Sequence, residues 1–315
     1  MIADTDLDHH ESPATAGAPL ASATRVTRRF GAFLAVAGVD LRVYRREVVG
    51  LLGANGAGKT TTIRMLLGLL APSDGELHLF GAPPDRAARR RIGYVPQGLG
   101  LWEDLTVAEN ISFSRNAFGR GGAVRLDDEL AASADVLVRD LPLGWRRRLA
   151  FAAALAHEPE LLVLDEPTSG VDPLARARLW DTIGAAAEDG AGVLVTTHSM
   201  QEAEQCDRLI VMAAGVVVAA GTTATIVGEA KAVEIEAHDW QLAFTRLDEA
   251  GLTPALTGRR LRVPGDDVTS VRELLVAANI TAQLRVVPAT LEERFVSLAR
   301  ASGHTSQNHS ERTAS

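Results

Sequence analysis

The sequence contains very little cysteine and lysine. Cys206 is the only cysteine among the 315 residues, so no disulfide can form within the chain. A lone cysteine fits a reducing compartment, and we expect Cys206 to be a packed small residue rather than a reactive thiol. Lysine occurs only as Lys59 and Lys231, although Lys and Arg together number 32. Lys59 therefore stands where a compact, mobile ammonium is needed and a planar guanidinium would not substitute.

The sequence also lacks an excess of positive charge and an uninterrupted apolar segment. Its formal net charge of −8 argues against nucleic acid as a partner. The first residues are acidic and rich in Pro, Ala and Ser, unlike a signal peptide. The window 209–227 approaches spanning length, but Gly215 and Gly221 interrupt it, and its Val and Ile content favours two short strands. We therefore expect no transmembrane helix.

A glycine-rich turn follows the apolar run Val48–Leu52 and has the spacing G-x-x-x-x-G-K-[ST]. Glycines let bare backbone amides approach phosphate oxygens, and the helix predicted to start at Thr61 presents the positive end of its dipole. Lys59 adds a charge for the β- and γ-phosphates, and Thr60 can ligate Mg²⁺. The expected nucleotide-binding residues of this turn are Gly53, Ala54, Asn55, Gly56, Ala57, Gly58, Lys59, Thr60 and Thr61.

Two further strands end in polar side chains that suit phosphoryl transfer. The apolar run Leu161–Leu164 is followed by Asp165 and Glu166, and the run Gly192–Thr197 is followed by His198. A carboxylate at the end of a buried strand can hold Mg²⁺, and a second one beside it can orient water. Alternating strands and helices predict a mostly parallel sheet, whose ligand lies at the carboxyl ends of the strands.

The expected fold class is α/β, a P-loop nucleotide hydrolase with two additions. A helical insertion spans about residues 98–157 within an ATPase domain of 23–228, with helices at Thr106–Phe118 and Leu126–Arg139. A small α+β domain with the order βαββαβ, which is ferredoxin-like, is expected over 229–300. Residues 1–22 and 301–315 have the composition of disordered tails.

In combination, these motifs resemble the ATP-binding subunit of an ABC transporter over about residues 24–221. The resemblance makes Gly53–Thr61 the Walker A loop and Leu161–Asp165 the Walker B strand. It gives Glu166, His198 and Lys59 catalytic roles, with Glu166 polarising the attacking water. It also implies ATP and Mg²⁺ as cofactors. The remaining contacts it implies are an aromatic stacking residue, a Mg²⁺ and water ligand, and a loop aspartate: Phe30, Gln97 and Asp172.

The segment Leu141-Pro142-Leu143-Gly144-Trp145 departs from the family signature L-S-G-G-Q. The serine that would contact the γ-phosphate of an opposite subunit is absent. Leu143 and Gly144 can still offer backbone amides at a helix N-terminus, provided that Pro142 precedes or opens that helix. The arginines at 146–148 are expected at a solvated helix start. This variant signature, and the segment from Pro288 to Phe295, resemble the drug-export branch of the family.

The resemblance implies an ATPase that powers export of a drug, an antibiotic or another small molecule. It implies a separate integral-membrane permease, a second copy of the ATP-binding subunit with ATP at a head-to-tail interface, and a position on the cytoplasmic side of the membrane. Two alternatives stay open: a soluble ABC-type ATPase that is not coupled to transport, and a nucleotide-dependent regulator that hydrolyses poorly. The aspartate–glutamate pair opposes the second alternative, whereas the altered signature favours it.

Overall fold

The computed structural model describes residues 17–118, 126 and 128–312. The chain divides into two compact units, Met1–Gly221 and Thr222–Ser315. The division lies after Gly221, so a short helix at 223–227 groups with the second unit, whereas the first domain was expected to extend to residue 228. Within the described ranges, no helix combines the length and the apolar character needed to cross a bilayer.

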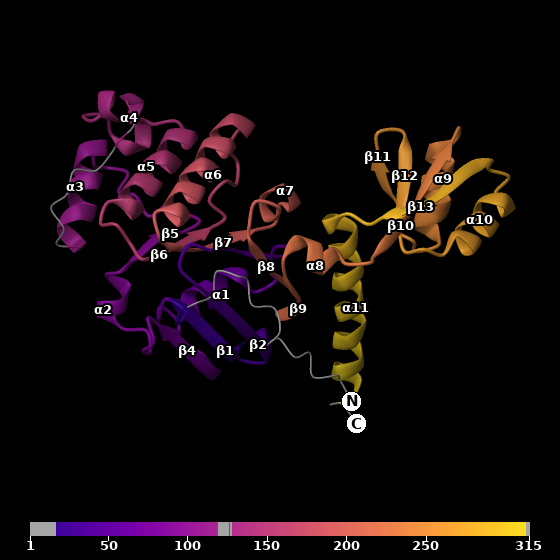
Figure 1. Ribbon diagram of the computed structural model, residues 1–315, viewed down its shortest axis with the longest axis horizontal. Coiled ribbons are helices and arrows are strands. Elements are labelled where there is room, and N and C mark those ends of the chain that lie inside the picture. The colour runs from indigo at the N-terminus through magenta and orange to yellow at the C-terminus, as the bar shows by residue number, and fades with distance from the viewer. Residues whose placement is uncertain (1–16, 119–125, 127, 313–315) are drawn as a thin grey trace. The chain divides into compact units, whose positions relative to one another are not determined.

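The first unit is built on a six-stranded mixed sheet (Figure 1). Five neighbouring strands are parallel and the last is antiparallel, which confirms the mostly parallel sheet. β3, β6 and β7 are buried along their whole lengths, as continuous apolar runs in a parallel sheet require. In spatial order the strands are β5 (Ile92–Val95), β6 (Leu161–Asp165), β7 (Gly192–Thr197), β3 (Val48–Leu52), β8 (Arg208–Ala213) and β9 (Val216–Gly221).

The window that approached membrane-spanning length forms strands, because β8 and β9 pair as a hairpin around residues 214 and 215. A second, antiparallel sheet has the order β2-β1-β4. Its first strand begins at Ala21, inside the segment 1–22 that was expected to be a tail, because Ala21 pairs with both Val43 and Leu79. Residues 1–16 lie outside the described part. The strands are β1 (Ala21–Phe30), β2 (Phe33–Val43) and β4 (Asp74–Leu79).

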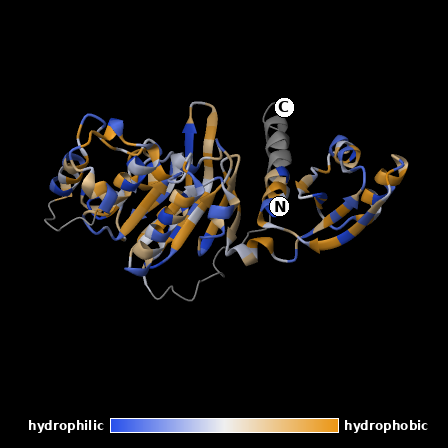
Figure 2. Cartoon of the chain, turned by 90° about the horizontal axis from the view of Figure 1, so that it is seen from above, coloured by the Kyte–Doolittle hydropathy of each residue, from blue (hydrophilic) through white to orange (hydrophobic). Residues whose placement is uncertain are grey.

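Helices complete the first unit, and its hydrophobic residues run along the central strands (Figure 2). The buried cluster between the two sheets includes Leu51, Ile63, Met65 and Leu79, all with no exposed surface. Burying one such side chain contributes about 1.5–3 kcal/mol. The helices are α1 (Lys59–Leu66), α2 (Arg86–Arg89), α3 (Val107–Phe118), α4 (Asp128–Ala132), a 3₁₀ turn (Val138–Asp140), α5 (Leu143–Leu155), α6 (Pro173–Glu188) and α7 (Met200–Ala203).

The helical insertion differs from its prediction at one point. The helix expected over Leu126–Arg139 is wrong, because α4 ends at Ala132. The following backbone pairs with the start of α3: the amide of Val107 donates to Val136 at 3.1 Å, and that of Val138 donates to Leu105 at 3.0 Å. These tertiary hydrogen bonds override the weak helix propensity of the segment. The glycine-rich connection at 119–122 lies outside the described residues.

The second unit has the element order βαββαβ between two helices. Its four antiparallel strands have the spatial order β11-β12-β10-β13. One face of the sheet packs against α9 and α10 through Val233, Ile235, Leu247 and Leu275. The elements are α8 (Thr223–Val227), β10 (Lys231–Ala237), α9 (Trp240–Glu249), β11 (Ala255–Thr257), β12 (Arg260–Pro264), α10 (Val268–Ala277), β13 (Ala282–Pro288) and α11 (Leu291–Arg312).

The last helix is longer than expected. α11 continues to Arg312, which differs from the disordered tail expected over 301–315. The start of α11 is fixed by Glu293, which accepts from the amide of Thr290 at 2.7 Å and pairs with Arg262 at 2.6 Å. Proline is absent from the sequence between 289 and 312, so no residue there is barred from continuing the helix.

Candidate functional site

The phosphate loop joins the end of β3 to the start of α1. The amide of Gly53 donates to the carbonyl of Thr197 at 3.2 Å, which fixes the loop to the end of β7. A Cβ at Gly53 would lie 2.5 Å from the carbonyl oxygen of Met212, so no larger residue fits there. Gly58 precedes α1 with φ 99°, and no side chain caps this helix. The first amides of α1 are therefore oriented for an anion.

Lys59 lies across the loop that it follows. Its Nζ donates to the carbonyls of Gly53 at 2.7 Å and Ala54 at 3.1 Å. The side chain is only 4% exposed, and Nζ also lies 3.4 Å from Oε1 of Glu166. An ammonium with three donors can exchange these partners for phosphate oxygens without leaving the loop.

Asp165 ends β6 directly beside the phosphate loop. Its Oδ1 accepts from the hydroxyl of Thr60 at 3.1 Å and from that of Thr196 at 2.7 Å. The side chain is buried, at 1% exposure. The Thr60 hydroxyl and the Asp165 carboxylate belong to two different motifs and are joined by a hydrogen bond. Their oxygens are therefore close enough to bind the same hard cation.

Glu166 follows Asp165 in an unusual backbone conformation. Its φ of 49° lies in the left-handed region, which non-glycine residues adopt mainly where the surrounding structure imposes it. The Glu166 amide donates to the hydroxyl of Thr196 at 2.9 Å, and Oε2 lies 3.5 Å from Nδ1 of His198. The imidazole is half exposed, whereas the carboxylate is 10% exposed. The carboxylate thus lies between the ammonium of Lys59 and the imidazole.

The structure brings together five of the predicted residues, namely Lys59, Thr60, Asp165, Glu166 and His198. The other loop residues, Ala54, Asn55, Gly56, Ala57 and Thr61, follow the same turn between β3 and α1. Within the described ranges, no hydrogen bond joins the remaining predicted residues to the phosphate loop. These residues are Phe30, Gln97, Leu143, Gly144 and Asp172.

Each of these five has a defined position. Phe30 ends β1, is 48% exposed and lies under the guanidinium of Arg28, 4.6 Å from the ring centroid. Gln97 is exposed and follows β5, at the same edge of the sheet as the phosphate loop. Asp172 caps α6 by accepting from the amide of Ala175 at 2.9 Å. Leu143 and Gly144 open α5, and Pro142 precedes it as its cap, which satisfies the condition placed on that proline.

Sequence reasoning missed two buried charged residues beside the site. Arg147 is 6% exposed, although the arginines at 146–148 were expected at a solvated helix start, and burial lowers the pKa of its guanidinium. Glu202, also 6% exposed, accepts from the hydroxyls of Thr168 and, at 2.6 Å, Thr197. One signal could have identified Arg147: it precedes the buried residues Ala150, Phe151 and Ala154 of α5 at helical spacing.

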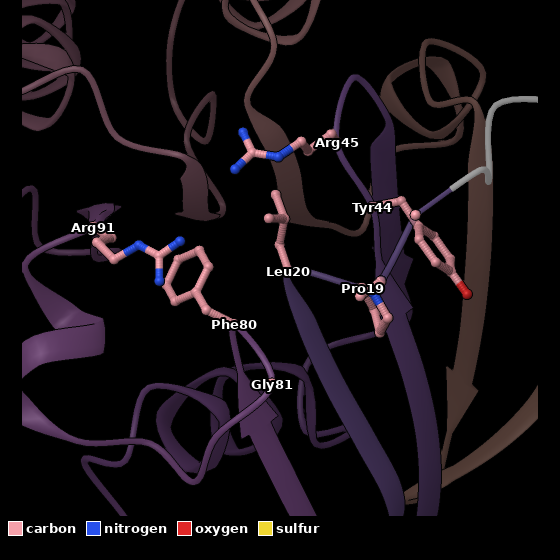
Figure 3. Close-up of a pocket in the computed structure, with 9 residues that line it drawn as sticks. Pro19, Leu20, Tyr44, Arg45, Phe80, Gly81 and Arg91 are labelled. Atoms are coloured by element: carbon pink, nitrogen blue, oxygen red, sulfur yellow. The ribbon is translucent and has the colours of Figure 1, made fainter.

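A cavity of about 350 Å³ lies away from this site, at the amino ends of the parallel strands (Figure 3). Tyr44 and Arg45 precede β3, and Arg91 precedes β5. Figure 3 shows the guanidinium of Arg91 over the ring of Phe80. The guanidinium carbon lies 3.6 Å from the ring centroid. Both arginines bind Glu160, which neutralises much of their charge. The candidate site is therefore the opposite edge, where the carboxyl ends of the strands gather the motif residues.

Comparison with known proteins agrees with this geometry. Residues 36–169 match the family described as ABC transporter. The Nod factor export ATP-binding protein I of Cupriavidus pinatubonensis is 38% identical over 297 residues, which cover 87% of this chain and 89% of that protein. The chain belongs to the ATP-binding proteins of ABC transporters. This membership confirms the family resemblance seen in the sequence.

Two other relatives of this ABC ATPase add detail. The probable multidrug ABC transporter ATP-binding protein YbhF of Escherichia coli is 41% identical over 224 residues, covering 68% of this chain but only 39% of that protein. A solved ATP-binding subunit of an ABC transporter has a TM-score of 0.62 and 30% identity, covering 66% of this chain and 91% of that one. A cassette solved with ADP and phosphate, MJ0796, is 24% identical with a TM-score of 0.57 and supports the fold.

Proposed function

We propose that this ABC ATPase hydrolyses ATP at the phosphate loop to power export of a small molecule through a separate membrane permease. The transported class would be a drug, an antibiotic or a similar compound, in line with the exporter names of its relatives. The observation that supports this most directly is the meeting of Lys59, Asp165 and Glu166 at one edge of the sheet. Phosphoryl transfer needs this combination of a cation, a metal-binding carboxylate and a water-orienting base.

Each predicted residue receives a role in this proposal. The amides of the loop hold the phosphates, Lys59 neutralises the β- and γ-phosphate charge, and Phe30 stacks on the adenine. Glu166 orients water and accepts its proton as the oxygen attacks the γ-phosphorus and the bond to ADP breaks. His198 lies 3.5 Å from that carboxylate, where it can contact the γ-phosphate. Removing the Glu166 carboxylate would slow the reaction more than it weakens ATP binding, because the base acts in the transition state.

Mg²⁺ is the metal that suits this site. The residues that would hold it are Thr60, Asp165 and Gln97, all oxygen donors, and the first two already lie 3.1 Å apart. Mg²⁺ prefers oxygen ligands and is commonly held by one or two carboxylates together with substrate phosphates. When bound, the ion would neutralise charge that develops on the phosphates. The chain contributes to metal binding by holding the Thr60 hydroxyl and the Asp165 carboxylate next to each other.

A second copy of this chain would complete the ATP site. Leu143 is 45% exposed at the start of α5, and Gly144 follows it, so both amides can face an opposite subunit. Asp172 and the loop before it would lie at the same head-to-tail interface. The second unit has the element order βαββαβ, and we propose it as a ferredoxin-like accessory domain of this subunit.

The permease would bind beside Gln97, which places the subunit on the cytoplasmic side of the membrane. A groove of about 400 Å³ lies between α2, β5 and the helical insertion, and its lining includes Arg86, Arg89, Arg90, Leu101 and Phe118. The neighbouring acidic residues Glu103 and Asp104 are paired with Arg146 and Arg139 inside the chain. Charge reversal at both acidic positions should weaken co-purification of the permease; unchanged recovery would contradict this docking site.

The decisive experiment compares ATP hydrolysis by the full chain and by Glu166→Gln, with and without a permease. We expect the substitution to lower kcat by about 10²–10⁴-fold, because it removes the base but keeps the size of the side chain. Glu160→Gln is the matched control, because Glu160 lies at the opposite edge of the sheet and binds Arg45 and Arg91. Equal rates for the parent and Glu166→Gln would defeat the assignment and favour a nucleotide-dependent regulator. Hydrolysis that no permease alters would favour an ATPase uncoupled from transport.

A further inference from the structure

The loop that carries Glu166 is bound by one buried arginine from a different part of the unit. Arg147 lies in the first turns of α5 and sends its guanidinium to the backbone that follows β6. Nη1 donates to the carbonyl of Pro167 at 2.6 Å and to that of Glu166 at 3.4 Å, and Nη2 donates to the carbonyl of Ser169. One side chain thus binds three carbonyls within four consecutive residues.

This loop needs such a partner because its backbone is irregular. Glu166 and Gly170 both have positive φ, at 49° and 76°, so the carbonyls between them do not point into a regular helix or strand. Buried carbonyls without a partner are costly, and the loop is buried from Glu166 to Thr168. A guanidinium offers five donors in a rigid plane and can satisfy several of these carbonyls at once.

The opposite side of the same loop is held by Glu202 of α7. The carboxylate accepts from the hydroxyl of Thr168 in the loop and from that of Thr197 at the end of β7. Arg176 lies 3.7 Å from the same carboxylate. The loop is therefore fixed between α5 on one side and β7 with α7 on the other, and His198 follows Thr197 directly.

The start of α5 also packs on the next part of the loop. A Cβ at Gly170 would lie 3.7 Å from Cδ2 of Leu143, and a Cβ at Gly144 would lie 4.0 Å from that of Ala175. The variant signature, Arg147 and the loop after Asp165 thus form one packed assembly within a single chain. A displacement of α5 would move the Arg147 guanidinium and, through its hydrogen bonds, the backbone at Glu166.

We propose that Arg147 is a positioning residue that holds Glu166 in its left-handed conformation and couples movement of α5 to the catalytic carboxylate. This inference rests on the role of Glu166 in the proposed function. It predicts that the arginine acts on the rate of hydrolysis through Glu166, without touching the nucleotide. Arg147 is set apart from Arg148, one residue further along α5, which pairs with Glu129 of the helical insertion.

Steady-state hydrolysis by the full chain tests the proposal. We expect Arg147→Gln to lower kcat about 10- to 100-fold, because charge-assisted hydrogen bonds are lost, while KM for ATP changes by less than about threefold. Arg147→Lys should recover part of the rate, because an ammonium can keep one or two of the carbonyls. Arg148→Gln should leave kcat within about twofold of the parent. An equal loss from Arg148→Gln would overturn the proposal.

A double substitution separates positioning from a general structural role. In the Glu166→Gln background, adding Arg147→Gln should change the remaining rate by less than about twofold, because both changes act through the same carboxylate. A further loss as large as in the parent background would overturn the proposal. If Glu166→Gln alone hydrolyses ATP as fast as the parent, the proposed function fails instead, so the two failures are distinct.

Hydrogen exchange tests the same contact without relying on activity. The amide of Glu166 donates to Thr196, and the amides of Ser169 and Val171 donate within the loop at 3.3 Å. We expect exchange at these amides to accelerate about tenfold or more in Arg147→Gln and to stay unchanged in Arg148→Gln. Unchanged exchange in the first variant would overturn the proposal. If the melting curve shows that Arg147→Gln does not fold, Arg147→Lys replaces it in both measurements. We then expect a lower kcat and faster exchange at the same amides, each by a smaller factor.

Discussion

The ion pair between Glu47 and Arg208 allows a stability prediction with a worked magnitude. Glu47 precedes β3 and Arg208 begins β8, and their side chains are 3% and 15% exposed. The guanidinium donates to the carboxylate from Nε at 2.8 Å and from Nη2 at 3.2 Å. Glu47 also accepts from the amide of Tyr44 at 3.1 Å. The pair therefore joins the strand that leads into the phosphate loop to its neighbour.

Replacing Arg208 with methionine would leave the Glu47 carboxylate buried with a single amide donor. Breaking a buried pair from one side costs about 3–5 kcal/mol, because an uncompensated charge stays buried. For a unit of this size, that loss lowers the melting temperature by about 6–20 °C. The double substitution Glu47→Leu with Arg208→Met removes both charges. The free energy of unfolding of this variant should lie within about 1 kcal/mol of the parent's.

Urea unfolding followed by tryptophan fluorescence is the assay, because three of the four tryptophans, Trp102, Trp145 and Trp180, belong to the first unit. The control is Arg139→Gln, whose partner Asp104 is 88% exposed, and which should cost less than about 1 kcal/mol. The reasoning fails if Arg208→Met costs no more than this control. It also fails if the double substitution loses the sum of the two single losses.

The remaining predictions concern the loop, the cysteine and the second unit. Gly53→Ala should weaken ATP binding about tenfold or more in a titration, because the new Cβ would lie 2.5 Å from the carbonyl oxygen of Met212. The control Gly184→Ala should leave binding unchanged, because a Cβ at Gly184 on α6 meets no atom within 4 Å. Burial raises the pKa of the Cys206 thiol to about 12, so iodoacetamide should modify it only in denaturant. The unfolded thiol ionises near pH 9, so the unfolding free energy should fall as pH rises above that value in urea titrations at several pH values. Burial would raise the pKa of Glu293, but hydrogen bonds from Arg262 and Thr290 outweigh burial and lower that pKa. Glu293→Gln should therefore lower the unfolding free energy of the second unit by about 2 kcal/mol at neutral pH. This difference from the parent should disappear in acid, as measured by thermal melts at several pH values.

Much of the fold and of the candidate site could be predicted because their signals are local. β3, β6 and β7 are continuous apolar runs, and each ends in polar residues whose type and spacing are typical of phosphate chemistry. A parallel sheet necessarily brings these ends together, so the meeting of Thr60, Asp165 and Glu166 follows from the strand pattern. The hairpin of β8 and β9 could be predicted for a similar reason, because glycine interrupts its apolar window.

The remaining features depend on contacts between distant segments. The helix expected from Leu126 to Arg139 does not form in full, because the backbone at Val136 accepts a hydrogen bond from the amide of Val107. No local sequence pattern indicates such a pairing. The burial of Arg147 depends on three carbonyls about twenty residues further along the chain. An arginine within a run of three arginines has the composition of a solvated surface. Only the position of a residue on the helix, and not its type, indicates which one turns inward.

The scarcity of lysine makes this chain suitable for amine-directed fluorescent labelling. Lys59 is enclosed by the loop carbonyls, whereas Lys231 is exposed at the start of β10. In the native protein, an amine-reactive dye would therefore have one accessible lysine side chain, and it lies in the second unit. With Trp240 replaced by phenylalanine, the tryptophans that remain all belong to the first unit, and energy transfer from them to that dye would report on the distance between the two units.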